Sequence, residues 1–134
     1  MIIKKVVRIP HPNLIELDRG EKVKLLGLGD SSFFETEENS SLNFIYQLIF
    51  NRYVKLVFDK KMIDDQGNLL CYIFLNTAIE GKPVWCMINK RMIVNGYCNV
   101  IYDPINNKHN EEFLFLEAIA KDKAKRIWKP KEEE

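Results

Sequence analysis

Apolar and polar residues alternate in several short segments of the chain, which is the pattern of half-buried strands. Residues 3–9, rich in Val and Ile, predict a first strand, and residues 14–17 and 23–28 predict the next two. Turn residues separate these segments, namely His11-Pro12-Asn13 and Asp18-Arg19-Gly20. The beginning of the chain is therefore expected to form a three-stranded meander.

A helical spacing of apolar residues first appears after residue 40. Ser40 or Ser41 can cap a helix there, whose apolar face would carry Leu42, Ile45, Tyr46 and Ile49. Alternation returns over residues 54–59, and an apolar run follows over 69–75. The turn residues of 64–68 lie between them, so these two segments predict a hairpin.

Two further helices are expected in the second half of the chain. Trp85 to Asn95 fits a short helix that Gly96 can terminate. Residues 97–102 are expected to be extended, and Asn110 can then cap a final helix. That helix would carry apolar residues at spacings of three and four, namely Phe113, Leu116, Ala120, Ala124 and Ile127. The residues expected to face the core are Phe113, Leu116, Ala120, Ile127 and Trp128.

The order of these elements is three strands, a helix, two strands and two helices. Five strands with a helix after the third is the chain order of a Greek-key OB-fold barrel. We therefore expect a mainly β domain with helices, of the α+β class, built as a five-stranded OB-fold barrel with three helices. A generic α+β sheet with its helices on one face is the alternative. Residues 1–128 are expected to form this single domain and residues 129–134 a charged C-terminal tail.

Composition and charge limit the kinds of binding and the cellular location that the sequence favours. The formal net charge of +1 gives no overall electrostatic argument for nucleic-acid binding, although a local basic patch is compatible with it. Cys71, Cys86 and Cys98 lack the spacing of a zinc site, and Cys71 and Cys98 lie in apolar segments and are expected to be buried. Because no apolar run approaches the ~20 residues of a membrane helix and the N-terminus is charged too early for a signal peptide, we expect a cytoplasmic protein without a membrane partner.

Several segments, taken in order, resemble the staphylococcal-nuclease-like (thermonuclease) family. Residues 23–28, V-K-L-L-G-L, are similar to the family's V-R-L-x-G-I. Residues 54–59, V-K-L-V-F-D, and 64–74, D-D-Q-G-N-L-L-C-Y-I-F, are similar to its V-x-L-E-F-D and D-K-Y-G-R-x-L-A-Y-V-Y. Residues 117–121 resemble its E-A-x-A-K closing helix, and the resemblance as a whole covers residues 6–128.

The resemblance implies an OB-fold and a phosphodiester-cleaving site. In that family a calcium ion is held by carboxylates of a D-G-D turn and a D-T-P-E segment, two arginines clamp the phosphate, and the glutamate of D-T-P-E is the base. Each part suits its task, because calcium prefers hard oxygen ligands, a phosphoryl transition state needs fixed positive donors, and the attacking water needs a nearby base.

This chain departs from the family's pattern at the positions that carry the chemistry. The D-G-D turn falls on His11-Pro12-Asn13, and the D-T-P-E segment falls on residues 29–32, G-D-S-S. The strand arginine falls on Lys24, which keeps the charge but loses the bidentate fork, and the Y-G-R arginine falls on Asn68. Tyr102, two residues before a proline, matches a nucleotide-contacting tyrosine of the family.

Other interpretations of these positions stay open. A one-residue bulge at Gly29 would bring Asp30 into the place of the first acid, where it could bind metal, with Glu35 or Glu37 as the base. Lys24 also fits a solvent-facing strand lysine, and Tyr102 also fits a core tyrosine.

We expect a catalytically degenerate staphylococcal-nuclease-like domain, a pseudo-enzyme that acts as a binding module for a protein or a nucleic acid. It would have no catalytic residue and no cofactor, and it would contact single-stranded nucleic acid weakly through Lys24, Asn68 and Tyr102. The alternative is a residual calcium-dependent nuclease acting on single-stranded DNA or RNA, with Asp30 as a metal ligand. Calcium-dependent cleavage separates the two hypotheses.

Overall fold

A six-stranded sheet and three helices make up the described part of the chain in the computed structural model, which covers residues 1–29 and 40–130. The strands are β1 (Ile2–His11), β2 (Leu14–Leu17), β3 (Lys22–Leu25), β4 (Tyr53–Ile63), β5 (Leu69–Asn76) and β6 (Trp85–Met87). The helices are α1 (Ser41–Ile49), α2 (Ile88–Val94) and α3 (Asn110–Asp122), followed by a 3₁₀ turn at Arg126–Trp128.

Five of the strands close into a barrel. Neighbours in the order β3-β2-β1-β4-β5-β6 pair antiparallel, and β3 also pairs in parallel with β5. In this closing pair Val23 lies opposite Leu69 and Leu25 lies opposite Cys71. The closure confirms the expected α+β OB-fold barrel and distinguishes it from an open sheet with helices on one face.

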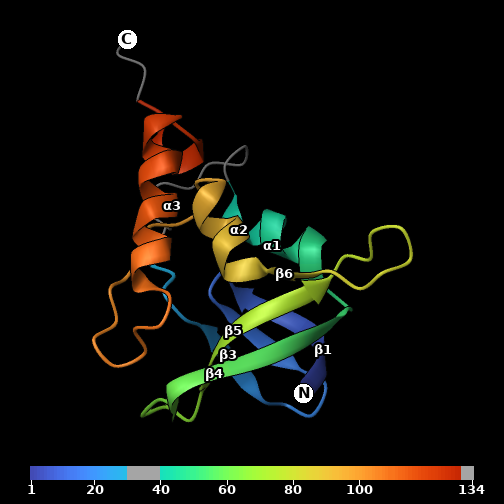
Figure 1. The fold of residues 1–134 in the computed structure, drawn as a ribbon. Helices are drawn as coiled ribbons and strands as arrows, with labels where there is room; N and C mark the ends of the chain where they lie inside the picture. The colour runs from blue at the N-terminus through green and yellow to red at the C-terminus, as the bar shows by residue number, and fades with distance from the viewer. Residues whose placement is uncertain (30–39, 131–134) are drawn as a thin grey trace.

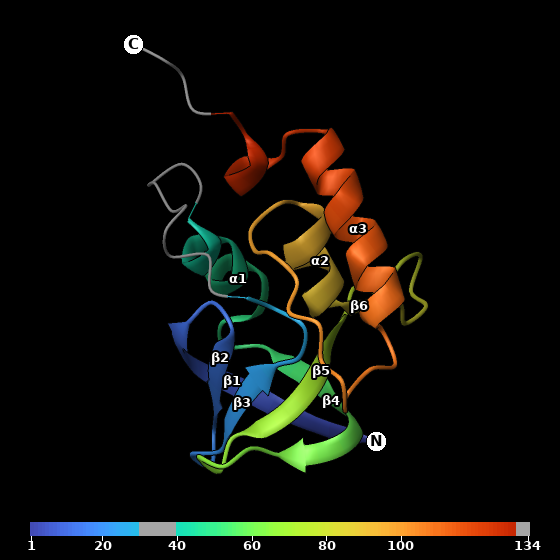
Figure 2. The ribbon, with the colours of Figure 1, turned by 90° about the vertical axis from the view of Figure 1, so that its left-hand side faces the viewer.

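The hydrophobic core fills the barrel and continues under the helices at one end of it. Alternate strand residues such as Val54 and Leu56 point inward and are almost fully buried. Ile45 and Ile49 of α1 and Ile88 of α2 join the same core. Figures 1 and 2 show α1 and α2 over one end of the barrel, with α3 lying beside α2.

The segment predicted as a helix over Trp85–Asn95 divides into two elements. Trp85–Met87 forms β6, with Met87 opposite Phe74 of β5, and the helix begins only at Ile88. The prediction of helix for the first three residues is therefore wrong. Helical spacing in a short apolar run does not exclude pairing with a strand edge, and here β5 supplies that edge.

The final helix begins one residue earlier than predicted. His109 is the residue before the first turn, and Asn110 lies inside the helix, so Asn110 is not the cap. Its buried amide instead donates to the Asp103 carbonyl oxygen at 2.7 Å, which fixes the loop before the helix. The predicted core face is confirmed for Phe113 and Ala120, which are fully buried.

The end of the helix also differs from the prediction. The helix stops at Asp122, so Ala124 lies beyond it with a φ of 49°. Ile127 is buried as predicted, whereas Leu116 and Trp128 are half-buried.

The third strand ends at Leu25 rather than at Leu28. Gly27 follows with a φ of 83°, and a Cβ atom there would overlap the ring of Phe113. Glycine therefore lets the segment after β3 turn and pass close to α3. Leu28 then pairs with Val100 in an isolated bridge.

A buried asparagine joins the helical and barrel layers. Asn89 of α2 donates to the carbonyl oxygen of Leu26 at 2.9 Å, and its own carbonyl oxygen accepts from the Ile73 amide at 2.9 Å. Because an unpaired buried amide is costly, this satisfied side chain holds α2, β5 and the segment after β3 in one arrangement.

Cys71 and Cys98 are buried free thiols, as predicted, and Cys86 is half-buried. Within the described ranges, no helix has the length and apolar character needed to span a membrane. Residues 131–134 of the expected tail lie outside the described residues, and the domain boundary after residue 128 stays a prediction.

Candidate functional site

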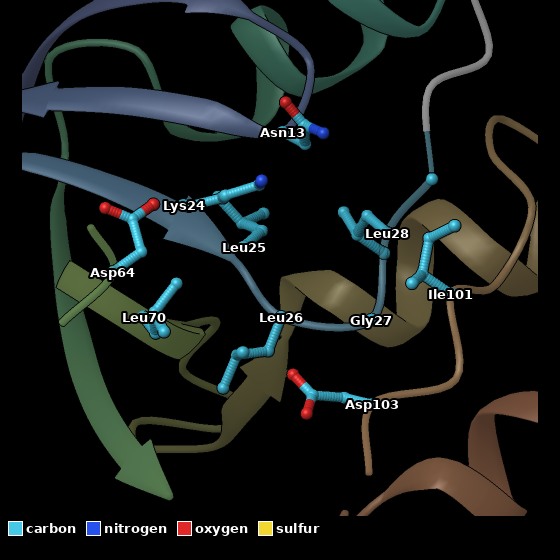
Figure 3. Close-up of a pocket in the computed structure, with 11 residues that line it drawn as sticks. Asn13, Lys24, Leu25, Leu26, Gly27, Leu28, Asp64, Leu70, Ile101 and Asp103 are labelled. Atoms are coloured by element: carbon cyan, nitrogen blue, oxygen red, sulfur yellow. The ribbon is translucent and has the colours of Figure 1, made fainter. Parts of the chain in front are cut away.

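Two neighbouring hollows lie beside β3, and we call them together the β3 groove. The larger has a volume of about 420 Å³ and the smaller about 290 Å³, and they share Asn13 and Lys24. Asp64 and Asp103 also line the larger hollow, while His11, Gln66 and Asn68 line the smaller. The larger hollow has an apolar lining of Leu25, Leu26, Leu28, Leu70 and Ile101 (Figure 3).

Lys24 is the only lysine or arginine among the described residues that line the groove. Alternation along β3 buries Val23 and Leu25 and turns Lys24 outward. Its ammonium forms no hydrogen bond or ion pair with another residue that the structure describes. In Figure 3 it lies between Asn13 and the segment after β3, so it is available to an anionic group.

Asp64 and Asn68 are tied together in the β4–β5 turn. The Asp64 carboxylate accepts from the backbone amides of Gln66 and Asn68, each at 2.9 Å, and from the Asn68 side chain at 3.1 Å. Partial burial alone would raise the pKa of Asp64, but these hydrogen bonds and the charge of Lys24 outweigh it and lower that pKa. Asp64 therefore places a negative charge at the groove.

Asp103 and its neighbours form the other side of the groove. The Asp103 carboxylate accepts from the backbone amides of Ile105 and Asn106, each at 2.9 Å. Beside it, Ile101 is 51% exposed and Tyr102 is 63% exposed. The alternative interpretation of Tyr102 as a core tyrosine is therefore wrong.

The loop that carries Asp103 is fastened to β4. The buried Asn106 side chain accepts from the Lys61 amide at 2.7 Å and donates to the Lys61 carbonyl at 2.9 Å.

Further along the loop, Asp59 of β4 accepts hydrogen bonds from the Tyr72 hydroxyl at 2.8 Å and from the Lys108 backbone amide at 3.1 Å. Although burial opposes it, this hydrogen bonding lowers the pKa of Asp59. The loop thus presents Tyr102 and Asp103 at a fixed place.

Gly29 lies buried at the position of the first acid of D-T-P-E in the gapless register. Its amide donates to the Asn99 carbonyl at 2.8 Å, and a Cβ atom at position 29 would collide with the Asn99 side chain. The Asn99 amide group thus fills the space that a side chain at position 29 would need. No donor among the described residues reaches its buried Oδ1 atom.

The described residues do not fit the calcium site that the resemblance implies. Position 13 carries an amide whose Oδ1 lies 2.7 Å from His11 Nδ1 in a hydrogen bond, and position 29 has no side chain. Among the described residues, no three His, Cys, Asp or Glu side chains converge, whereas calcium takes six to eight oxygen ligands. Asp30, the ligand of the bulged register, lies outside the described residues, as do Glu35 and Glu37.

The fold and the groove together define the class of protein: an OB-fold barrel with a groove beside β3, whose described lining residues include one lysine and two aspartates. A model of the staphylococcal nuclease homologue family matches residues 32–130, and the chain belongs to that family. None of the curated proteins matches the chain. Because the family match begins after β3, positions 13, 24 and 29 are related to the family's pattern by the resemblance of the first three strands.

The structure brings together two of the three residues that the sequence singled out, because Lys24 and Asn68 line the same hollow. Tyr102 lines neither hollow, although its sequence neighbours Ile101 and Asp103 line the larger one. Sequence reasoning missed Asp64, Asp103 and Asn99 as part of the site. An Asp in a turn has no distinguishing signal, because the same residue type initiates ordinary loops.

Proposed function

We propose that this chain is a non-catalytic binding domain on the staphylococcal nuclease fold. The observation that supports the proposal is the packing of Asn99 against Gly29, because in the gapless register Gly29 stands where the chemistry needs an acid. The amide at position 13 and the change from arginine to Lys24 and Asn68 support it. Losing one preorganised donor typically costs ~10²–10³ in rate, so several losses leave little catalysis.

The groove residues suggest how such a domain would contact single-stranded nucleic acid. Lys24 would pair with a phosphate, and the exposed ring of Tyr102 would stack on a base. The Asn68 amide hydrogens are already donated to Asp64 and Gln66, so Asn68 can offer a ligand only its carbonyl oxygen. Because Asp64 and Asp103 oppose the single charge of Lys24, this contact is weak.

A protein segment is the second candidate partner of the groove. The apolar lining of the larger hollow, which includes Leu26 and Leu70, favours an apolar side chain. Its two aspartates favour a cationic side chain over a phosphate. The same groove therefore suits a short segment of another protein that carries both kinds of residue.

The decisive experiment combines digestion and melting assays of the whole chain with and without calcium. We expect no cleavage of plasmid or single-stranded substrates and no appreciable shift in melting temperature. A working site of ~10 μM affinity would add about 2.7 kcal/mol of stability at ~1 mM calcium, which melting would detect. A clear shift together with cleavage that Asp30→Ala abolishes would overturn the proposal and establish the bulged register.

A further inference from the structure

The outer surface of β1, β4, β5 and β6 is covered at one end and open at the other. Tyr72 points outward from β5 but is buried beneath His109 and Phe113, with ring centroids 4.5 and 6.0 Å away. Two residues further along β5, Phe74 is only half-buried. Figure 1 looks onto this part of β4 and β5, and no helix of the described residues lies in front of it.

Strand register places six residues together on this uncovered part. Lys5 lies opposite Tyr53, and Lys55 lies between Ile3 of β1 and Phe74 of β5. Trp85 lies opposite Asn76, two residues after Phe74 and on the same side of the sheet. We call this surface the open sheet face: Ile3, Lys5, Tyr53, Lys55, Phe74 and Trp85.

Aromatic rings and ammonium groups alternate on the open sheet face. The Lys55 ammonium lies 4.8 Å from the centre of the Phe74 ring and 4.6 Å from the centre of the Trp85 ring. Tyr53 is 61% exposed and Ile3 is 44% exposed. Rings from β5 and β6 thus flank a lysine that the cation–π contacts hold over the sheet, and Tyr53 lies two residues before this lysine on β4.

The charge of the open sheet face selects the class of partner. Its residues include two lysines and no carboxylate, so it complements an anion. A second copy of the chain placed face to face would bring lysines together without a partner for them. Bases stack on exposed aromatic rings of a sheet while phosphates pair with the cations between them.

We propose that the open sheet face binds single-stranded nucleic acid, with a base stacked on Tyr53 and phosphates against Lys5 and Lys55. This surface is separate from the β3 groove, because β3 contributes none of its residues. The inference therefore does not rest on the function proposed for the groove. An acidic protein segment would use the lysines but would not need the rings.

The test is a fluorescence-anisotropy titration of the whole chain with labelled single-stranded oligonucleotides in the absence of calcium. Tyr53→Ala should weaken binding roughly 5- to 150-fold, the range expected when one stacked base is lost. Tyr53→Trp should preserve binding because the ring remains. Phe115→Ala is the matched control, since Phe115 is 66% exposed on the outer side of α3, and it should change binding less than about twofold.

Salt dependence tests the two lysines. Lys5→Gln and Lys55→Gln should each reduce the slope of log affinity against log salt by about 0.7, the value for one phosphate contact on a single strand. Unchanged slopes in both variants would contradict their role. Displacement of the oligonucleotide by polyglutamate of equal charge, as effectively as by unlabelled oligonucleotide, would also overturn the inference, because charge alone would explain binding.

The outcomes separate this surface from the groove. If Tyr102→Ala and Lys24→Gln weaken binding while Tyr53→Ala does not, the open sheet face is not the site and the groove proposal stands. Absence of measurable binding at about millimolar protein would overturn the inference as well, since even non-specific contacts usually give ~10⁻⁴–10⁻⁶ M. Cleavage of the oligonucleotide would instead overturn the function proposed for the groove.

Discussion

Gly29 and Asn99 share one small space beside the β3 groove, and each restricts what the other can be. Gly29→Asp should destabilise the fold by about 1–3 kcal/mol, because the new side chain must displace the Asn99 amide group. Asn99→Ala should recover part of that loss in the double variant. Urea unfolding of the two single variants and the double variant measures the coupling, and a coupling energy below about 0.3 kcal/mol would contradict this packing.

Asp59 links stability to pH through its hydrogen bonds to Tyr72 and Lys108. Its pKa is lowered from 3.8 in the folded chain, so its contribution is present above about pH 4 and is lost as the pH falls through the folded-state pKa. Asp59→Asn should therefore reduce the free energy of unfolding at about pH 7 but matter less at about pH 3. Denaturant unfolding of both proteins at both pH values checks this, and an equal difference at the two values would refute it.

At the scale of elements, Phe113 is the largest fully buried side chain of α3. This ring is fully buried, packs edge-on against Tyr72 and lies in the space that Gly27 leaves open. Phe113→Ala should lower the free energy of unfolding by ~3–5 kcal/mol, the usual cost of truncating a buried aromatic residue. A loss below about half a kcal/mol in denaturant unfolding would show that α3 contributes little to the core.

The helix α3 also shows what helical spacing in the sequence can and cannot predict. The spacing from Phe113 to Ala120 identified the buried face correctly, because helical geometry relates residues three and four apart. The cap at Asn110 was wrong because the side chain bonds to Asp103 in the preceding loop. The residue type shows which side chains can cap a helix. A tertiary hydrogen bond, such as that of Asn110 to the preceding loop, can engage the same side chain instead.

For the whole molecule, a net charge of +1 limits how tightly any nucleic acid can be held. Binding of single-stranded DNA or RNA should be no tighter than about micromolar at physiological salt, within the ~10⁻⁴–10⁻⁶ M usual for non-specific contacts. It should strengthen as salt is lowered. Titration across a salt series measures this, and submicromolar affinity at physiological salt would indicate a more extensive interface than the groove and the open sheet face provide.

The sequence by itself determined the local elements and the family. Alternation and helical spacing are local patterns, so they identified most strands and helices and the order typical of an OB-fold. The order of short family-like segments indicated the staphylococcal nuclease fold. The sequence also showed where the chain departs from the pattern of a working nuclease, namely at His11-Pro12-Asn13, Lys24 and Asn68.

The tertiary structure decided which distant residues meet. Alternation along a strand predicts on which side of the sheet Lys24 and Tyr53 lie. It does not predict which strands pair with each other. The parallel β3–β5 pair, the packing of Asn99 on Gly29 and the row of Lys55, Phe74 and Trp85 all join segments far apart in sequence. The physical reason is that such contacts follow from register and barrel closure, and a local pattern specifies neither of them.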